Sequence, residues 1–533
     1  MITGYNMKLS VFKRLAVGLM RFLTKPITAH LAIFLLIYTL LNALDIYSSA
    51  VNGFNTFFKV FSGIFFAYVL VLPVILLRNK VQKVYKIVIL VFAVAIFLVD
   101  FYLFLMMQRT FATMGNDVVA AILATNPAEA KEFVNTSFAV DKLIYCVVAV
   151  AIVVTAFYYL NRVYIKWYIL SEFIILVLIA LAFNISLGQF YRFKQGNIYY
   201  LYSHECPDLR NYRQNPDVVC NDDSLENIVL ILGESFTKHH SSLYGYEKDT
   251  NPLLGRMVAD STLFVYENVK SACTSTIPAI KSLMTSWLES VDYDKTWYKC
   301  LTLIEIMQTA GYKTYWISNQ SKTGIYDNEV GRYADLCDEQ SFVGNMHSGI
   351  KRSDLDECLL PFIEEKVEQS SGKSFFIIQM MGSHRDYSLR YSDEYKNFTP
   401  QDYNATHPRL SKKNKAVVAH YDNSILYNDY VVTEIMKLFK EEDAVVLYLS
   451  DHGQDVFDTS DDFFGHSAEH GYDIPMMFYP TPVFCEKHGE LVNSIKSNTE
   501  KEFRTDSLMY TIMDIAGIET VNGISYKQKS LLK

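Results

Sequence analysis

Three residues that commonly bind metal ions follow directly after two apolar segments of the sequence. Glu234 comes after the apolar segment 228–232, and Asp451 and His452 come after 444–449. Two carboxylates and one imidazole suit Zn²⁺ in a catalytic site; they also suit Mn²⁺, and suit Mg²⁺ less well because that ion prefers all-oxygen ligation. We therefore predict that these three side chains bind at least one metal ion.

A run of hydroxyl side chains lies between these two segments. Thr274, Ser275 and Thr276 precede Pro278 and a helical pattern over 276–288, and proline is tolerated in the first turn of a helix. The N–H groups at a helix start favour the negative charge of a phosphoryl group, and a metal ion can activate a weakly nucleophilic hydroxyl. All three hydroxyls are candidate nucleophiles, and Thr276 is closest to the helix start. The simpler interpretation is a helix N-cap without a catalytic role.

Two further histidines have positions from which they could act on a phosphoryl group. His384 follows the apolar segment 375–381, and His466 lies shortly after His452. Each could contact a phosphoryl oxygen, act as an acid or base, or bind a second metal ion; His470 competes with His466 because the spacing is loose. We assign no role to five other histidines of this region, which are His239, His240, His407, His420 and His488.

From residue 226 onward, short apolar segments alternate with helical patterns. The predicted strands are 227–232, 263–267, 313–318, 375–381, 444–450 and 474–479. The predicted helices are 276–288, 301–310, 355–368 and 415–440. This alternation favours an α/β domain with a largely parallel sheet, in which ligands bind beyond the carboxyl ends of the strands. The polar segment 387–416, which contains two prolines, is predicted to be a mobile insert.

The long apolar segments of the chain are concentrated before this domain. Five of them have a length near the about 20 residues that a transmembrane helix needs: 27–46, 56–77, 87–107, 143–160 and 167–187. Lysine and arginine gather before the first span, between the second and third, and between the fourth and fifth. The positive-inside rule therefore places the N-terminus in the cytoplasm and the region after the fifth span outside. The loop 108–142 has an amphipathic pattern that is typical of helices lying on a membrane surface.

These patterns divide the chain of 533 residues into three parts. We predict a transmembrane domain over 1–190 with surface helices in 108–142, a linker over 191–225, and an exported catalytic α/β domain over 226–533. The formal net charge of −8 and the lack of a basic patch argue against nucleic acid as a partner.

The cysteines agree with an exported domain, because all of them except Cys146 follow the last predicted span. An oxidising compartment would allow three disulfides and leave one thiol over. Closeness in sequence favours the pairs Cys206–Cys220 and Cys337–Cys358, and Cys273–Cys300 is a third pairing. The alternative is a set of buried free thiols.

Several motifs, in the same order along the chain, resemble the phosphoethanolamine transferases of Gram-negative envelopes, which include the lipid A modifying enzymes behind polymyxin resistance. The matching segments are Asn227 to Ser235, Ser242-Leu243-Tyr244-Gly245-Tyr246, Asn251-Pro252, Cys273 to Thr276, Met381-Gly382-Ser383-His384, Asp451-His452-Gly453 and Gly465-His466. The resemblance covers nearly the whole chain and implies a sulfatase-like (alkaline-phosphatase-like) fold. It also implies one or two zinc ions with Glu234, Thr276, Asp451 and His452 as ligands, Thr276 as the nucleophile, and His384 and His466 around the transferred group.

The resemblance extends to residues that bind the substrate. In the family, Asn, Thr and Glu at four-residue spacing on the surface-helix loop hold the substrate; Thr125 and Glu129 match, whereas Ala121 stands at the first position. Glu129 could pair with an ethanolamine ammonium group. Asn319 to Lys322 resembles another substrate-contacting loop with a shifted register, which makes Ser321 and Lys322 predicted substrate contacts.

The resemblance implies a multi-pass enzyme of the Gram-negative inner membrane with its catalytic domain in the periplasm, and we expect a monomer. The donor would be phosphatidylethanolamine, and the acceptor lipid A, the LPS core or another envelope glycan; the residues Gln454 to Asp458 favour a core sugar. One alternative is a glycerol-phosphate transferase of the lipoteichoic-acid-synthase type, which often uses Mn²⁺. Another is a catalytically silent membrane receptor, but no metal ligand is missing. Sulfatase activity is disfavoured because no Cys or Ser followed by X-Pro-X-Arg occupies the nucleophile position.

Overall fold

The structure is a computed structural model that describes residues 208–220, 225–286, 297–320, 322, 329–343, 355–459, 464–465 and 469–533, with the isolated positions Val84, Ile144, Val148 and Ala151. The chain divides into two compact units, Met1–Ser203 and His204–Lys533, and the division falls within the predicted linker. No helix in the described part of the chain has the length and hydropathy to cross a bilayer. Apart from those isolated positions, the five predicted spans and the loop 108–142 lie outside the described residues and stay predictions.

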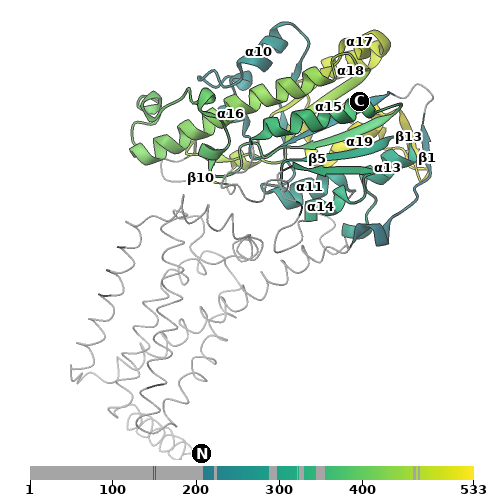
Figure 1. The fold of residues 1–533 in the computed structure, drawn as a ribbon, viewed down its shortest axis with the longest axis horizontal. Coiled ribbons are helices and arrows are strands. Elements are labelled where there is room, and N and C mark those ends of the chain that lie inside the picture. The colour runs from purple at the N-terminus through teal and green to yellow at the C-terminus, as the bar shows by residue number, and fades with distance from the viewer. Residues whose placement is uncertain are drawn as a thin grey trace, which may run out of the picture. The chain divides into compact units, whose positions relative to one another are not determined.

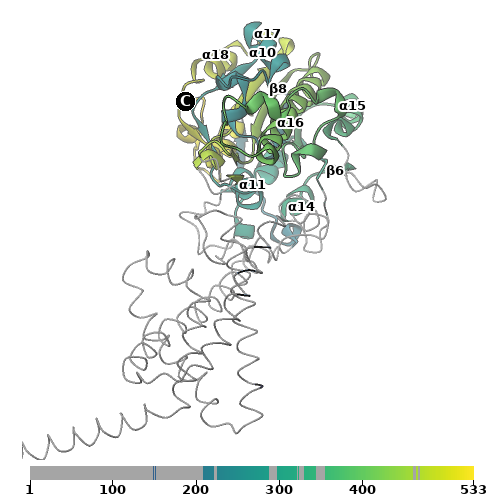
Figure 2. The same ribbon diagram turned by 90° about the vertical axis from the view of Figure 1, so that its left-hand side faces the viewer.

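A sheet forms the centre of the second unit (Figure 1). It has seven strands in the order β3-β11-β8-β2-β7-β5-β6. Its five parallel strands are β8 (Ala444–Ser450), β2 (Asn227–Gly233), β7 (Ser374–Gln379), β5 (Lys313–Ser318) and β6 (Glu339–Phe342). β11 (Met476–Pro480) runs antiparallel to both β8 and β3 (Phe264–Tyr266). This sheet confirms the predicted α/β domain and its six predicted strands. β6, which forms one edge of the sheet (Figure 2), was not predicted.

Two hydrophobic cores cover the two faces of the sheet. β2 is buried along its whole length and alternates between them, with Ile228, Leu230 and Leu232 in one core and Val229 and Ile231 in the other. A continuous apolar strand of this kind is typical of a parallel sheet that is buried on both faces. The core around Val229 is closed by α10 (Pro252–Ala259), α15 (Leu360–Gln369) and α16 (Lys412–Leu438). The core around Leu230 is closed by α11 (Thr276–Met284), α13 (Leu303–Thr309), α14 (Glu329–Ala334), α17 (Pro482–Lys487), α18 (Gly489–Ser497) and α19 (Leu508–Ile515).

Three two-stranded sheets complete the part of the domain that is described. They pair β1 (Val218–Cys220) with β13 (Ile518–Val521), β9 (Asp455–Val456) with β10 (Phe464–Gly465), and β4 (Val269–Lys270) with β12 (Phe503–Arg504). The pair β9 and β10 belongs to the polypeptide that leaves β8, so it follows the predicted metal ligands directly.

The segment 387–416 packs against α16, so the prediction of a mobile insert is wrong. It forms the short 3-10 helices η7 (Tyr387–Leu389), η8 (Asp393–Tyr395) and η9 (Pro400–Tyr403) before α16 begins. Tyr391, Tyr403 and Leu410 are buried. Asn423 of α16 accepts the backbone N–H groups of residues 397 and 398 at 2.8 Å each. A few aromatic anchors at irregular spacing therefore hold a segment whose overall composition is polar.

The predicted disulfide between Cys337 and Cys358 does not form. Cys337 belongs to the core on one face of the sheet and donates its thiol hydrogen to Tyr333 O at 3.9 Å. Cys358 packs against the other core, and its sulfur lies 3.4 Å from Asn319 Oδ1. The two residues are close in sequence but pack on opposite faces of the sheet. Cys220 carries a free thiol whose pKa is raised by burial; its predicted partner Cys206 lies outside the described residues. The predicted disulfide between Cys273 and Cys300 does not form either.

Candidate metal centre and nucleophile

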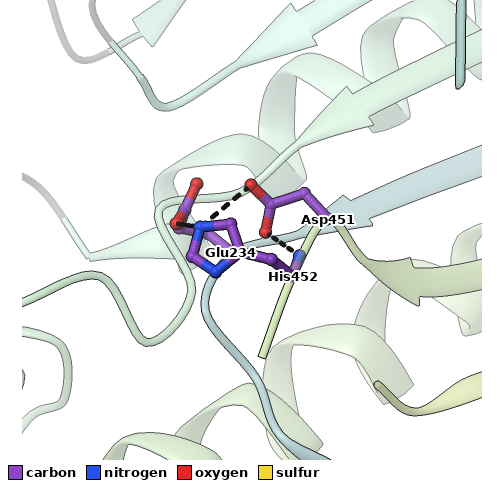
Figure 3. A group of neighbouring side chains, drawn as sticks. All are labelled: Glu234, Asp451 and His452. Atoms are coloured by element: carbon purple, nitrogen blue, oxygen red, sulfur yellow. Dashed lines mark hydrogen bonds and ion pairs between the residues drawn. The ribbon is translucent and has the colours of Figure 1, made fainter. Parts of the chain in front are cut away.

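The three predicted metal ligands come together at the carboxyl ends of β2 and β8 (Figure 3). These strands are neighbours in the sheet and Gly233 lies opposite Ser450, so the residues that follow start side by side. The donor atoms of Glu234, Asp451 and His452 all lie within 4.8 Å of one another, and all three side chains are buried. The structure thus brings the three predicted ligands together.

Backbone contacts orient the ligand atoms toward a shared space. His452 lies with Nδ1 2.9 Å from Gly453 O, which places an N–H on that nitrogen and directs Nε2 toward the carboxylates. Nε2 lies 3.2 Å from Glu234 Oε1 and 3.6 Å from Asp451 Oδ2. Asp451 Oδ1 accepts the backbone N–H groups of Ser235 and His452, at 3.2 and 2.7 Å. Among the described residues, the buried Asp451 Oδ2 has no hydrogen-bond partner.

The electrostatics of the cluster indicate a missing positive charge. Burial and the nearby charge of Glu234 raise the pKa of Asp451 to about 8. Burial opposes ionisation of Glu234 too, but the hydrogen bond and charge of His452 outweigh it and hold the pKa of Glu234 well below its usual range. Burial would lower the pKa of His452, yet Asp451 and Glu234 raise it to about 9. Without a metal ion the three groups must share protons. A dication would replace those protons and satisfy Asp451 Oδ2, so the donor set fits zinc.

Thr276 places its hydroxyl against two of these ligands. Its Oγ1 donates to Glu234 Oε2 at 3.1 Å and lies 3.3 Å from His452 Nε2. α11 begins at Thr276, and its N-cap residue is Ser275, whose side chain makes no capping hydrogen bond. The hydroxyl of Thr276 therefore faces the candidate metal centre instead of capping the helix, which favours Thr276 over Thr274 and Ser275 as the nucleophile.

The loop after β7 brings His384 to the same region. Gly382 has a φ of +51°, and a Cβ there would lie 2.8 Å from both the N and O atoms of Glu234. Ser383 N donates to Glu234 O at 2.9 Å, so the loop lies directly against the ligand. Burial lowers the pKa of His384 to about 4, and its buried Nδ1 has no hydrogen-bond partner in the described part of the chain. His384 is thus a neutral imidazole with an available nitrogen.

Two residues that the sequence did not single out hold these loops in place. Gln320, at the end of β5, donates from Nε2 to Glu234 Oε2 at 3.3 Å and to Met380 O at 3.0 Å. Asp356 accepts the backbone N–H groups of Met381 and Gly382, at 2.7 and 2.8 Å. Gln320 follows a predicted strand, as the metal ligands do, and this position in the sequence could have identified it as a site residue. Asp356 lies in a predicted helix and gave no such signal.

The remaining predicted site residues are not brought to the cluster by any described contact. His466, Ser321, Thr125 and Glu129 lie outside the described residues. The ammonium group of Lys322 lies 2.6 Å from both Asp335 Oδ1 and Gln340 Oε1. Two roles therefore stay predictions. One is substrate binding by Thr125, Glu129, Ser321 and Lys322, and the other is the action of His466 on the transferred group. The competing His470 lies instead beside Asp458, with its ring stacked on His239 at 3.7 Å.

Residues 226–518 match the sulfatase family, and the chain belongs to this family. The chain is similar to phosphoethanolamine transferase EptC of Escherichia coli O18:K1:H7, with 25% identity over 525 residues that cover 90% of this chain and 87% of the relative. It is also similar to a crystal structure of the C-terminal periplasmic domain of EptC from Escherichia coli in complex with zinc, with 25% identity and a TM-score of 0.54 over 60% of this chain and 89% of that one. These matches confirm the resemblance to phosphoethanolamine transferases.

A further solved structure supports the fold alone. It is the integral membrane protein lipooligosaccharide phosphoethanolamine transferase A (EptA) from Neisseria meningitidis, with 21% identity. The match has a TM-score of 0.61 and covers 95% of this chain and 98% of that one.

Proposed function

We propose that this protein transfers phosphoethanolamine from phosphatidylethanolamine to a glycan of the cell envelope, lipid A or the LPS core, through a covalent intermediate on Thr276. The observation that carries the proposal is the position of the Thr276 hydroxyl, 3.1 Å from Glu234 and 3.3 Å from His452 at the start of α11. The similarity to EptC over 90% of the chain supplies the substrate class.

The transfer takes place in two displacements at phosphorus. In the first, Thr276 Oγ1 forms a bond to phosphorus, the bond from phosphorus to the glycerol oxygen breaks, and diacylglycerol leaves with the proton that the hydroxyl gives up. In the second, an acceptor oxygen forms a bond to phosphorus, the bond to Thr276 breaks, and the threonine regains a proton. Splitting one transfer into two displacements is the usual advantage of a covalent nucleophile.

The residues around Thr276 have separate parts in this scheme. Glu234, Asp451, His452 and Thr276 would hold a zinc ion, which supplies the positive charge that lowers the pKa of the hydroxyl. The backbone N–H groups at the start of α11 face the phosphoryl oxygens. His384, neutral because burial lowers its pKa to about 4, donates a hydrogen bond to the transferred group, and His466 is assigned to the same group.

The proposal includes the environment of the enzyme. We place residues 1–190 in the inner membrane of a Gram-negative bacterium as five spans, the linker at 191–225, and residues 226–533 in the periplasm as a monomer. Thr125 and Glu129 would select the donor, because a carboxylate pairs with an ammonium headgroup.

The proposed intermediate can be tested by mass spectrometry of the full-length protein incubated with phosphatidylethanolamine and no acceptor. The peptide that contains Thr276 should gain one phosphoethanolamine group. Thr276→Ala should fold, bind membrane and lack both adduct and turnover, whereas the matched control Ser275→Ala should keep both, since Ser275 makes no capping hydrogen bond. An adduct on Thr274 or Ser275, or an active Thr276→Ala enzyme, would refute the assignment.

The same experiment separates the two alternatives. An adduct of glycerol phosphate formed from phosphatidylglycerol would identify a transferase of the lipoteichoic-acid-synthase type. The absence of any adduct with either lipid, in a protein that binds zinc, would favour a receptor without catalysis.

A further inference from the structure

A second buried charged cluster lies outside the site just described. His240, on η2 (Lys238–His240), is fully buried between two carboxylates. Its Nδ1 lies 2.5 Å from Asp422 Oδ1, and its Nε2 lies 3.1 Å from Asp458 Oδ1. An imidazole that donates from both nitrogens must be doubly protonated. The cluster is therefore an ion triad, Asp422–His240–Asp458, with a positive charge at its centre.

The triad joins three segments that are far apart in the sequence. His240 belongs to the segment that leaves β2 after Glu234, and Asp458 belongs to the segment that leaves β8 after Asp451 and His452. Asp422 belongs to α16. The triad thus connects the two ligand-bearing loops to each other and to a long helix, at a point beyond the ligands themselves.

The other polar atoms of the triad are satisfied. Asp422 Oδ2 accepts the hydroxyl of Tyr246 at 2.8 Å and that of Tyr403. Asp458 Oδ2 accepts Val456 N at 3.3 Å and lies 3.5 Å from His470 Nδ1. A fully satisfied buried network of this kind specifies one arrangement of the segments that carry it.

The ligand loops need such a connection because both contain strained backbone. Ser235, directly after Glu234, has a φ of +59°, and Phe457, directly before Asp458, has a φ of +68°. Left-handed conformations of residues other than glycine persist only when the surroundings enforce them. Tyr421, beside Asp422, accepts Thr237 N at 2.9 Å and donates to Ser235 O at 2.7 Å, so α16 also holds the backbone just after Glu234.

We propose that the triad Asp422–His240–Asp458 positions the two ligand loops, and so sets the separation between Glu234 and the pair Asp451–His452 that zinc binding requires. The three residues do not touch the metal ion or the substrate; they are positioning residues. The inference rests on the proposed metal site, because without a metal ion the separation of the ligands would have no chemical consequence.

The test compares full-length Asp458→Asn with a matched variant, Asp443→Asn. Asp443 precedes β8 and lies 3.1 Å from His488 Nε2, so the control breaks a comparable pair at the opposite end of the same strand. We expect Asp458→Asn to weaken zinc affinity about tenfold or more, in the range seen when residues that orient metal ligands are lost, and Asp443→Asn to leave zinc affinity unchanged. Competition with a chelator measures both. Asp458→Glu should restore part of the affinity because it returns the charge.

A second measurement reports on the loops without metal or turnover. Ser235 N donates across to Asp451 Oδ1 and is a direct link between the two loops. In the metal-free protein, the amide hydrogen of Ser235 should exchange faster in Asp458→Asn and in His240→Gln than in wild type or Asp443→Asn. If His240→Gln fails to fold, Asp458→Asn alone decides the result.

The outcomes separate this inference from the proposed function. A wild type that exchanges slowly at Ser235 but binds no zinc would refute the metal site and leave the positioning role standing. An Asp458→Asn protein with wild-type zinc affinity and wild-type exchange at Ser235 would refute the positioning role, and so would equal losses in Asp443→Asn.

Discussion

β8 has an aspartate and a histidine near each of its ends, and the two pairs differ in how their polar atoms are used. Before the strand, the carboxylate of Asp443 accepts hydrogen bonds from His488 Nε2 at 3.1 Å and from Lys487 Nζ at 3.1 Å. Two donors therefore share one carboxylate. After the strand, Asp451 and His452 share their space with a second carboxylate, Glu234, and Asp451 Oδ2 has no hydrogen-bond partner among the described residues.

The comparison shows which feature distinguishes a reactive pair from a structural one. Both pairs contain one aspartate and one histidine, and each aspartate lies next to an end of β8. At the amino end, the charges are balanced and the acceptor atoms are occupied. At the carboxyl end, there is one carboxylate too many and an unused acceptor, which a dication would satisfy. In an α/β sheet this is also the end at which ligands bind.

The largest effect that the comparison predicts is that of Asp451→Asn. The amide cannot supply the charge that zinc needs, so purified variant protein should contain much less zinc than wild type, and transfer should fall by on the order of a thousandfold or more. Elemental analysis and an assay with labelled phosphatidylethanolamine measure the two losses. Wild-type zinc content in the variant would remove Asp451 from the ligand set and end the contrast with Asp443.

A smaller effect is expected from Gln320→Leu, which removes the amide that donates to Glu234 Oε2. Loss of a partner that orients a ligand should lower kcat about tenfold or more and leave the KM for the donor nearly unchanged. The matched control is Gln308→Leu, because Gln308 bonds Thr314 Oγ1 at 2.9 Å near the start of β5 instead of its end. Equal losses of activity in both variants would show that Gln320 acts through stability alone.

Some of this site could be predicted from the sequence because strand ends are easy to recognise in an α/β pattern. Glu234, Asp451, His452 and His384 all follow apolar segments that became β2, β8 and β7. The triad could not be predicted, because His240 has meaning only beside Asp422, 182 positions away. The sequence alone assigned no role to His240 for that reason.

The same limit explains the errors in the fold. The segment 387–416 reads as a polar insert because its anchors, such as Tyr403, are few and irregularly spaced. The pairing of Cys337 with Cys358 was inferred from closeness in sequence, and it failed because the two residues lie on opposite faces of the sheet. Contacts between elements decide both cases, and a single sequence does not contain them.

The pH dependence of stability should report on the charge of His240 in the triad. Burial would lower the pKa of His240, but the charges of Asp458 and Asp422 outweigh it and raise the pKa to about 10. A raised folded-state pKa gives a stability contribution that is fully present below the unfolded pKa of about 6.5 and is lost as the pH rises through about 10.

Wild-type protein should therefore lose unfolding free energy between about pH 6.5 and 10, by up to about 1.4 kcal/mol per pH unit from this group. In Asp458→Asn the slope should be shallower, because one of the charges that raises the pKa is gone. Urea unfolding of the unit His204–Lys533 within the full-length protein at several pH values provides the measurement. Identical slopes in wild type and variant would show that His240 is not held in its charged form.

The smallest effect belongs to Asp443→Asn, and it completes the comparison of the two ends of β8. His488 and Lys487 would each lose a charged acceptor, but both are partly exposed, with side-chain exposures of 20% and 50%, so water can replace part of what is lost. We expect the denaturant midpoint of unfolding to fall slightly, with zinc content and transfer unchanged. Chemical denaturation and the transfer assay, applied to the same preparation, measure these quantities together. Loss of zinc or of transfer in this variant would mean that the amino end of β8 is coupled to the metal centre. The distinction between a structural pair at one end of the strand and a reactive pair at the other would then not hold.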